Sequence, residues 1–346
     1  MTLARHLSRV VLIRVLWAVL ALGGLAIALD LIESAADVLK REDGGLFRYL
    51  GLRAPLILTA VTPVALILGP VLAFLSLSGR NEFTILRAAG ATTYRMLWML
   101  APLAVLLGLG FFAMTDRVAP TLEARLLTWL APEPDSATGA FWARTTMGVV
   151  HADASSPRGD LIVGVDIYSV DPSGRLTARI DASAARFANG DWRFDEATRL
   201  IPGEAKSVRI DGGLWKTPLR PANVRALATP SRNVAGDVAG RILSGVWSGN
   251  RTTEFYQVRV YRGYAAFLTP FVMFLLAAPA AFGTRRGGGL GKRAVLAVAL
   301  GFGYLLFDGM LIALGETGNL PPALAAFGAA AIFASLGAWI LITLEE

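Results

Sequence analysis

The sequence predicts an α-helical polytopic membrane protein with six transmembrane helices and an inserted, jelly-roll-like all-β domain. Three observations lead to this prediction. Of the 346 residues, 54% are hydrophobic and only 17% are charged, and the mean hydropathy is +0.53, well above that of a soluble globular domain. Six apolar runs are long enough to cross a bilayer. Between the third and fourth runs lies a polar stretch with strand-like alternation.

Residues 1–131 are expected to hold the first three spans. The apolar run Val10–Leu29 is interrupted only by Arg14, and the helix is expected to continue outside the bilayer until Gly44-Gly45. A cleaved signal peptide is the alternative, but the run exceeds the usual apolar core of about 7–15 residues and no A-x-A site follows.

The second and third spans are expected at about Pro55–Leu77 and Met96–Met114. Internal prolines in the second span predict a kinked helix packed against its neighbours, which satisfy the freed carbonyl groups. The helical pattern of the third span runs on until Pro132.

Residues 132–250 contain no run of spanning length. Alternating residues predict strands at Leu161–Tyr168 and Arg175–Ile180. Turn signals occur at Asp171–Gly174, Asn189-Gly190 and Asp211–Gly213. We expect an all-β insertion with its own core, a small sandwich or jelly roll.

Residues 251–346 are expected to hold the last three spans. A helical lead-in, Thr252–Arg262, precedes the fourth span. The spans are expected at about Gly263–Phe282, at Ala294–Leu314, and from Pro321-Pro322 to Ile342.

Basic residues indicate the orientation. The amino-terminal tail, the Arg80–Arg95 segment and the Arg285–Arg293 loop fall on one side in a six-span count. The positive-inside rule therefore places both termini in the cytoplasm and the β domain on the opposite side, either outside the cell or in a periplasm.

The segment Arg80–Arg95 has helical amphipathic spacing and lies between the second and third spans. It is either a docking helix along the membrane face or a connector whose arginines only fix topology. Residue types alone leave both interpretations open.

The sequence lacks an enzyme signature. Cysteine is absent and the two histidines are isolated, so neither a metal cluster nor a catalytic triad is expected. The glycine-rich loop Arg285–Arg293 departs from a phosphate-binding loop, because Arg286 replaces its first glycine and Arg293 its Ser/Thr. No cofactor is expected. The net charge of +7 is scattered, which argues against nucleic acid.

Two charged features remain. Asp308 lies inside the fifth span, where a carboxylate needs a partner, a cavity or water; we favour a structural or cavity-lining role over a proton relay. Lys40 and Arg41 follow the first span, where they would contact either an anionic headgroup of a substrate or ordinary lipid phosphates.

The chain resembles the LptF/LptG (YjgP/YjgQ) permeases of the lipopolysaccharide export ABC transporter over nearly its whole length. The similarity lies in six spans divided three and three by a β domain, with Arg80-Asn81-Glu82 and Leu86–Gly90 between spans two and three. Gly213–Leu219, Glu254–Gln257 and Asp308 followed by Pro321-Pro322 look more like the LptG branch than the LptF branch.

The resemblance implies a permease without its own nucleotide site, paired with an LptF-like paralogue and joined by an LptB-like ATPase dimer and an LptC-like single-span partner. Residues 80–92 would be the coupling helix, with Glu82 at the ATPase groove and Arg87, Ala88 and Gly90 at neighbouring motif positions. Lys40 and Arg41 would contact lipopolysaccharide phosphates. A further family lysine is replaced here around Glu33–Ser34.

The implied mechanism is lateral extraction of the lipid into an apolar cavity lined by spans one, two and five, followed by its passage into the β domain. Two alternatives are a mechanotransmitter whose β domain regulates a periplasmic partner, and a secondary transporter that uses Asp308. The second is disfavoured because no charge partner for Asp308 is evident in the sequence.

Overall fold

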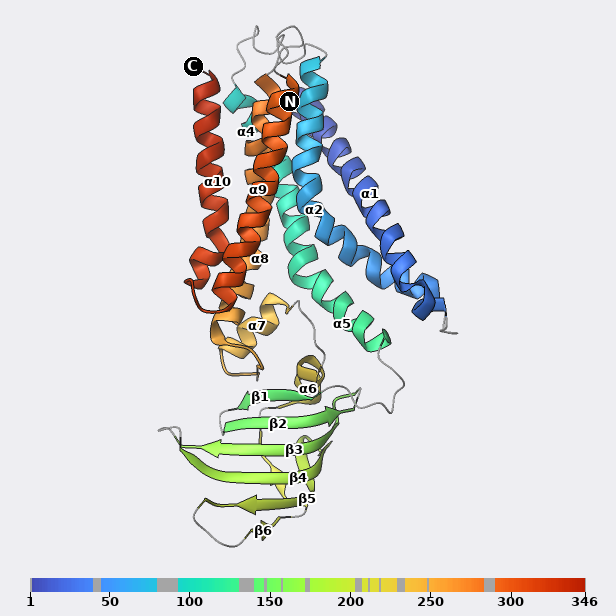
Figure 1. The fold of residues 1–346 in the computed structure, drawn as a ribbon, viewed down its shortest axis with the longest axis vertical. Coiled ribbons are helices and arrows are strands. Elements are labelled where there is room, and N and C mark those ends of the chain that lie inside the picture. Colours follow the sequence, from blue (N-terminus) through green and yellow to red (C-terminus); the bar gives the residue numbers. More distant parts are fainter. Residues whose placement is uncertain are drawn as a thin grey trace. The chain divides into compact units, whose positions relative to one another are not determined.

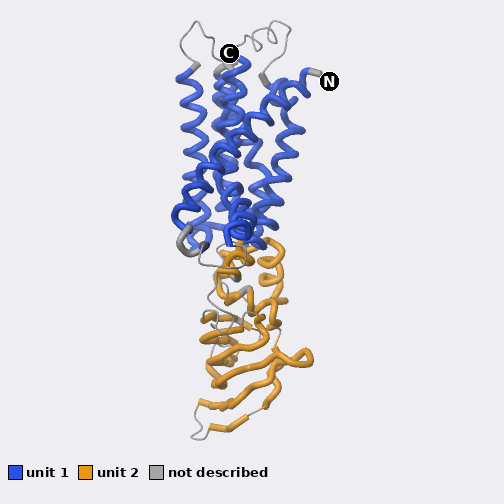
Figure 2. Tube along the Cα trace, turned by 90° about the vertical axis from the view of Figure 1, so that its right-hand side faces the viewer, with its two compact units in different colours: residues 1–122, 257–346 blue, residues 123–256 orange. Residues whose placement is uncertain are grey.

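The structure is a computed structural model that describes the chain apart from residues 1, 40–44, 80–92, 131–139, 146–147, 157, 172–174, 203–206, 211, 218, 229–233, 248, 283–289 and 346. The chain divides into two compact units (Figure 2). One contains residues 1–122 and 257–346, here called the membrane unit, and the other contains residues 123–256, here called the β unit.

Six helical segments in the described part of the chain are long and apolar enough to cross a membrane, which confirms the predicted spans. The helices that form them are α1 (Thr2–Leu39), α2 (Gly45–Gly79), α4 (Thr93–Ala113), α8 (Thr253–Ala277), α9 (Leu290–Glu316) and α10 (Pro322–Glu345) (Figure 1). The strand-rich segment lies between the third and fourth of these spans, as predicted.

Several helices extend beyond their apolar runs. The first helix continues to Leu39, and the third span continues through a π-helical turn, η1 (Met114–Val118), into α5 (Ala119–Leu130). The fourth begins at the predicted lead-in and ends in a short 3-10 turn, η2 (Ala278–Phe282). The predicted helical continuations are therefore confirmed as far as Leu39 and Leu130, and Gly44 and Pro132, at their predicted ends, lie outside the described residues. The π-helical turn has no signal in the apolar periodicity.

Helix α2 packs directly against α1 and α9. A Cβ atom added to Gly69 would lie 2.6 Å from the Val15 Cα atom of α1, and one added to Gly301 of α9 would lie 2.5 Å from a side-chain carbon of Ile67. Glycine permits this approach because it has no side chain, a common basis of helix packing in membranes. Helix α2 contains Pro55, Pro63 and Pro70 and is visibly bent (Figure 1).

The β unit contains one antiparallel sheet whose first six strands follow one another in chain order, while the seventh also pairs with the fifth. The strands are β1 (Phe141–Thr145), β2 (Gly148–Ser155), β3 (Leu161–Val170), β4 (Leu176–Ala188), β5 (Asp191–Leu200), β6 (Val208–Arg209) and β7 (Leu214–Trp215). Asn189 and Gly190 both have positive φ in the β4–β5 hairpin, as a type I′ turn requires.

One row of residues that takes no part in the cross-strand pairing marks a bend in the sheet. On each of four neighbouring strands, successive buried residues are three positions apart instead of two: Ala152 and Ser155, Ile162 and Val165, Ala182 and Ala185, Phe194 and Ala197. The intervening row, Asp153, Gly164, Ser183 and Glu196, falls between the paired positions. Because this row adds one residue to each of the four strands, the apolar side chains on both sides of the bend point to the same face of the sheet.

Helix α6 (Pro221–Ala228) covers this apolar face. Its Val224 and Leu227 join the same core as the sheet, and the Trp192 indole nitrogen donates a hydrogen bond to the Leu219 carbonyl at 3.0 Å. This helix and α7 (Gly236–Leu243) were not predicted from the sequence. The inserted β domain is confirmed, although its described strands form one bent sheet with a helical cover instead of two facing sheets.

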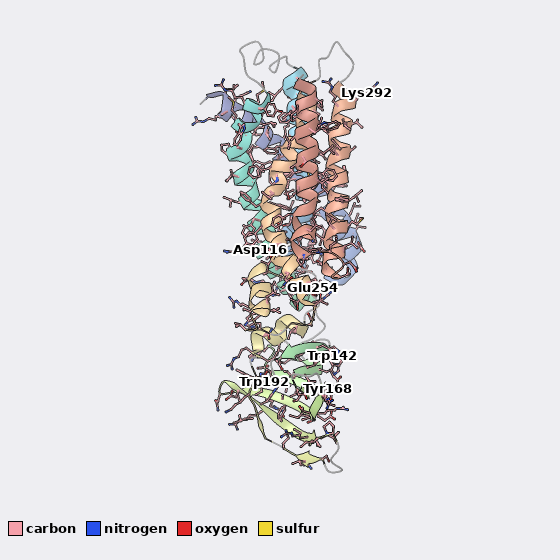
Figure 3. All side chains as sticks on the ribbon, turned by 90° about the vertical axis from the view of Figure 1, so that its left-hand side faces the viewer. Asp116, Trp142, Tyr168, Trp192, Glu254 and Lys292 are labelled. Atoms are coloured by element: carbon pink, nitrogen blue, oxygen red, sulfur yellow. The ribbon has the colours of Figure 1, made fainter. Side chains whose placement is uncertain are left out.

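The opposite face carries charged and aromatic side chains. Trp142 and Tyr168 project away from the core residue Trp192 (Figure 3). Asp166 and Asp181 are direct cross-strand partners, and Arg179 bridges them with nitrogen–oxygen distances of 3.0 and 3.1 Å. The hydrogen bond that the two carboxyl groups share lowers the pKa of Asp166 and raises the pKa of Asp181.

Replacing Gly69 with alanine should destabilise the membrane unit, because the added Cβ atom meets backbone atoms of Val15 that cannot rotate away. We expect a cost of about 1–3 kcal/mol. Gly51→Ala on the same helix is the matched control, since nothing lies within 4 Å of its added Cβ. Thermal stability of both variants in detergent checks this, and equal stabilities would contradict the close helix contact.

The carboxyl pair predicts opposite effects for two substitutions. The raised pKa means that the folded protein favours the protonated form of Asp181. Protonated Asp181 therefore contributes to folding stability below its unfolded pKa, and this contribution is lost as pH rises through its folded pKa. Asp181→Asn should therefore raise the unfolding temperature of the full-length protein at pH 7, and the gain should disappear in acid.

Asp166 has a lowered pKa, so its charged form contributes stability that is lost as pH falls through the folded pKa. Asp166→Asn should therefore lower the unfolding temperature at pH 7. Unfolding temperatures of both variants, measured between pH 3 and 7, test the assignment, and two variants with the same sign at pH 7 would refute it.

Candidate functional site

Most of the residues predicted to act in transport lie outside the described residues. These are Lys40, Arg41, Glu82, Arg87, Ala88 and Gly90. The structure describes Asp308 and the helices that flank the other positions. The candidate site is therefore built from the ends of those helices and from the polar groups within the membrane unit.

The predicted coupling segment joins two helix ends that lie at the basic end of the membrane unit. Helix α2 ends at Gly79 and α4 begins at Thr93, and Figure 1 shows both near the start of α9 and the two chain termini. Lys292 lies at this end and Asp116 lies well away from it (Figure 3). That this end faces the cytoplasm remains a prediction of the positive-inside rule.

The other end of α1 and α2 carries a polar network that the sequence analysis missed. Asp30 of α1 accepts hydrogen bonds at 2.6 and 2.9 Å from Arg53 of α2. The Tyr49 hydroxyl lies 2.6 Å from the other Asp30 oxygen and 2.9 Å from the Ser34 hydroxyl. The network ties together the helix ends on either side of Lys40 and Arg41. In the sequence, Asp30 and Arg53 are visible as charged residues beside apolar runs. The spacing of residues along one helix does not show which residue of another helix each of them contacts.

Asp308 belongs to a second polar group, between α8 and α9. Arg262 of α8 interacts electrostatically with Asp308, and Thr269 of α8 is hydrogen bonded to Tyr304 of α9. Tyr304 and Thr269 are buried at 3% and 6% exposure. No charge partner of Asp308 was evident in the sequence, because Arg262 is too far from it along the chain for a local pattern to reveal the interaction. The arrangement fits a structural role, since a charge in a bilayer needs an opposite charge nearby.

The membrane unit also has large apolar surfaces. Helix α1 exposes a stripe at helical spacing and α9 exposes a second one. The residues are Ile13, Leu16, Trp17, Leu20, Leu25, Leu29 and Ile32 on α1, and Val295, Leu296, Phe302, Leu306 and Met310 on α9. Such surfaces can face lipid chains or another membrane subunit.

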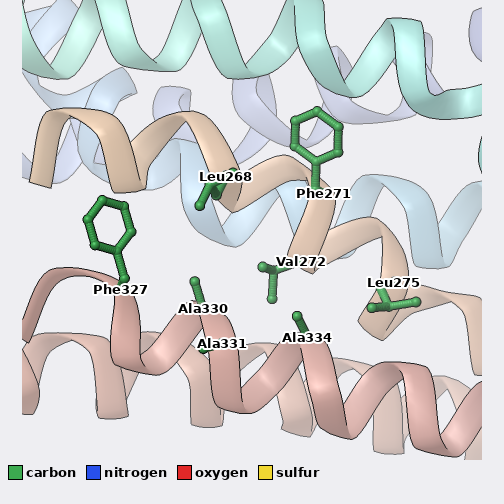
Figure 4. Close-up of a pocket in the computed structure, with 8 residues that line it drawn as sticks. All are labelled: Leu268, Phe271, Val272, Leu275, Phe327, Ala330, Ala331 and Ala334. Carbon is green, nitrogen blue, oxygen red and sulfur yellow. The ribbon is translucent and has the colours of Figure 1, made fainter. Parts of the chain in front are cut away.

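A separate apolar groove of about 310 Å³ lies between α8 and α10 (Figure 4). Its lining side chains are all apolar, with Phe271 on the α8 wall and Phe327, Ala330 and Ala334 on the α10 wall. Without a polar group to orient a ligand, this groove offers shape and hydrophobic contact only.

The comparisons with known proteins agree with this architecture. A family model described as "Lipopolysaccharide export system permease LptF/LptG" matches residues 5–343. The "Lipopolysaccharide export system permease protein LptG" of Escherichia coli strain K12 is 24% identical to this chain over 332 residues, covering 91% of this chain and 92% of the relative. The protein of the same name from Escherichia coli O6:H1 gives the same values.

The matched range includes all six spans and the whole inserted β unit. It confirms the resemblance that the residues between the second and third spans indicated. This chain is a multi-pass membrane protein that belongs to the LptF/LptG family of lipopolysaccharide export system permeases.

Proposed function

We propose that this chain is the permease subunit of an ABC transporter that extracts lipopolysaccharide from the outer leaflet of the inner membrane and passes it to a periplasmic bridge. The observation that carries the proposal is the family match over residues 5–343, which includes both three-span halves and the insertion. The names of the Escherichia coli relatives support the LptG branch.

The energy is supplied by a separate LptB-like ATPase dimer, and the permease works with an LptF-like paralogue and an LptC-like single-span partner. Residues 80–92 dock on the ATPase as a coupling helix, with Glu82 at the groove and Arg87, Ala88 and Gly90 beside it. The position of this segment between the ends of α2 and α4 supports the assignment, because a rigid helix there can transmit movement to two spans.

The substrate occupies an apolar cavity formed with the paralogous permease. The exposed apolar stripes of α1 and α9 support this, since they provide walls for acyl chains. Lys40 and Arg41 follow the Leu39 end of α1 and bind the lipid phosphates. The bent sheet at about residues 132–250 receives the lipid in the periplasm, and both termini remain in the cytoplasm.

Glu82→Lys should reduce retention of the ATPase on the purified permease several-fold, because it reverses a charge at the proposed docking groove. Glu345→Lys makes the same charge change at the end of α10 and serves as the control. Co-purification in mild detergent measures the effect. Normal retention of the ATPase by Glu82→Lys would contradict the docking role.

Reversing both cations with Lys40→Glu and Arg41→Glu should raise the lipopolysaccharide concentration for half-maximal stimulation of ATP hydrolysis by about tenfold or more, since each cation contributes about 1 kcal/mol near anionic headgroups. Lys40→Arg with Arg41→Lys keeps both charges and should behave nearly as the wild type. Unchanged stimulation in the reversed variant would remove both residues from the substrate path.

A further inference from the structure

Arg53 is a cation fixed in place at the junction of α1 and α2. Two of its guanidinium nitrogens, Nε and Nη2, donate to the same Asp30 oxygen, at 2.9 and 2.6 Å. The second Asp30 oxygen is occupied by the Tyr49 hydroxyl, and Tyr49 is only 3% exposed. Because Asp30 is itself held from both sides, the guanidinium plane has a defined orientation.

The two members of this ion pair are unequally exposed. The Arg53 side chain is 39% exposed and the Asp30 side chain only 15%. The carboxylate therefore faces the helix junction and the guanidinium faces outward. The bonds to Asp30 use Nε and Nη2, and Arg53 is also hydrogen bonded to Tyr49, whereas a guanidinium carries five N–H groups in its planar fork. A planar arginine fork of this kind matches the geometry of a phosphate.

The depth of Arg53 suits a lipid headgroup. It lies eight residues after the first residue of α2, so about 12 Å along the helix from that end. The 35 residues of α2 extend over about 52 Å, longer than the roughly 30 Å of hydrocarbon in a bilayer. Because α2 is bent, its length alone does not fix the depth of Arg53. Asp30, to which Arg53 is bonded, directly follows the apolar run Val10–Leu29 of α1, which places Arg53 near the boundary between hydrocarbon and headgroups, at the end of α2 away from Lys292.

We propose that Arg53, oriented by Asp30 and Tyr49, binds a phosphate of a lipid headgroup at the junction of α1 and α2. This inference rests on the proposed function, because it gives the lipid substrate of that function a cation on α2. Lipopolysaccharide and an anionic glycerophospholipid both carry the phosphate chemistry concerned. Asp30 is a positioning residue that makes no contact with the lipid.

The test uses the complete transporter complex and compares three variants. Arg53→Gln removes the cation, Asp30→Asn removes its partner but keeps the cation, and Arg48→Gln removes another exposed cation of α2 as the matched control. Native mass spectrometry measures retention of two probes added separately, lipopolysaccharide and phosphatidylglycerol. Unfolding temperatures show whether each variant is folded.

We expect Arg53→Gln to weaken retention of a phosphate-bearing probe about tenfold. Asp30→Asn should weaken it by about threefold, because Arg53 keeps its charge but is held less firmly, and Arg48→Gln should leave it nearly unchanged. If Arg53→Gln weakens retention of lipopolysaccharide alone, the ligand of Arg53 is the proposed substrate. If Arg53→Gln weakens retention of both probes, Arg53 belongs to a general phosphate site.

A role restricted to the ion pair predicts a different pattern, in which Asp30→Asn weakens retention as much as Arg53→Gln does. That result, or retention of both probes by a folded Arg53→Gln complex, would overturn the inference. A wild-type complex that holds phosphatidylglycerol through Arg53 but never holds lipopolysaccharide would support the phosphate site and count against the proposed substrate.

Discussion

The close approach of α2 to α1 on one side and to α9 on the other is the constraint on which the membrane unit depends. Helices that cross a bilayer gain little from apolar burial alone, because lipid chains are equally apolar, so their association relies on close van der Waals contact. Gly69 and Gly301 supply that contact by leaving out a side chain at each crossing. Helix α2 consequently cannot move without affecting the two helices whose apolar stripes are exposed.

This position makes α2 the physical link between the two ends of the proposed mechanism. At Gly79 it leads into the proposed coupling segment, and near its other end Arg53 and Tyr49 bind Asp30 of α1. A shift of the Gly79 end would therefore reach the junction beside Lys40 and Arg41 through a continuous helix. On its other side α9 faces α8, where Thr269 is hydrogen bonded to Tyr304 and Arg262 interacts electrostatically with Asp308.

The sequence predicted the structural features that are determined by residues close together in the chain. Apolar length located the six spans, and Asn189-Gly190 located a hairpin turn because both positions need positive φ. It did not predict features that require distant segments to meet. The bend in the sheet arises from aligned residues such as Gly164 and Glu196 on different strands, and the partners of Asp30 and Asp308 lie on other helices. Periodicity describes one element at a time, whereas these pairings exist only after folding.

We expect movement that enters through residues 80–92 to change how α2 packs against α9. The chain has no cysteine, so spin labels can be attached at single introduced cysteines. Phe47 of α2 and Met310 of α9 are exposed at 84% and 56% and suit a labelled pair. In the reconstituted complex, the distance between the labels should change when ATP is bound, and this change should vanish when residues 80–92 are scrambled in a complex that still assembles. A distance change that persists after scrambling, or its absence in a complex that still exports its lipid, would contradict the account.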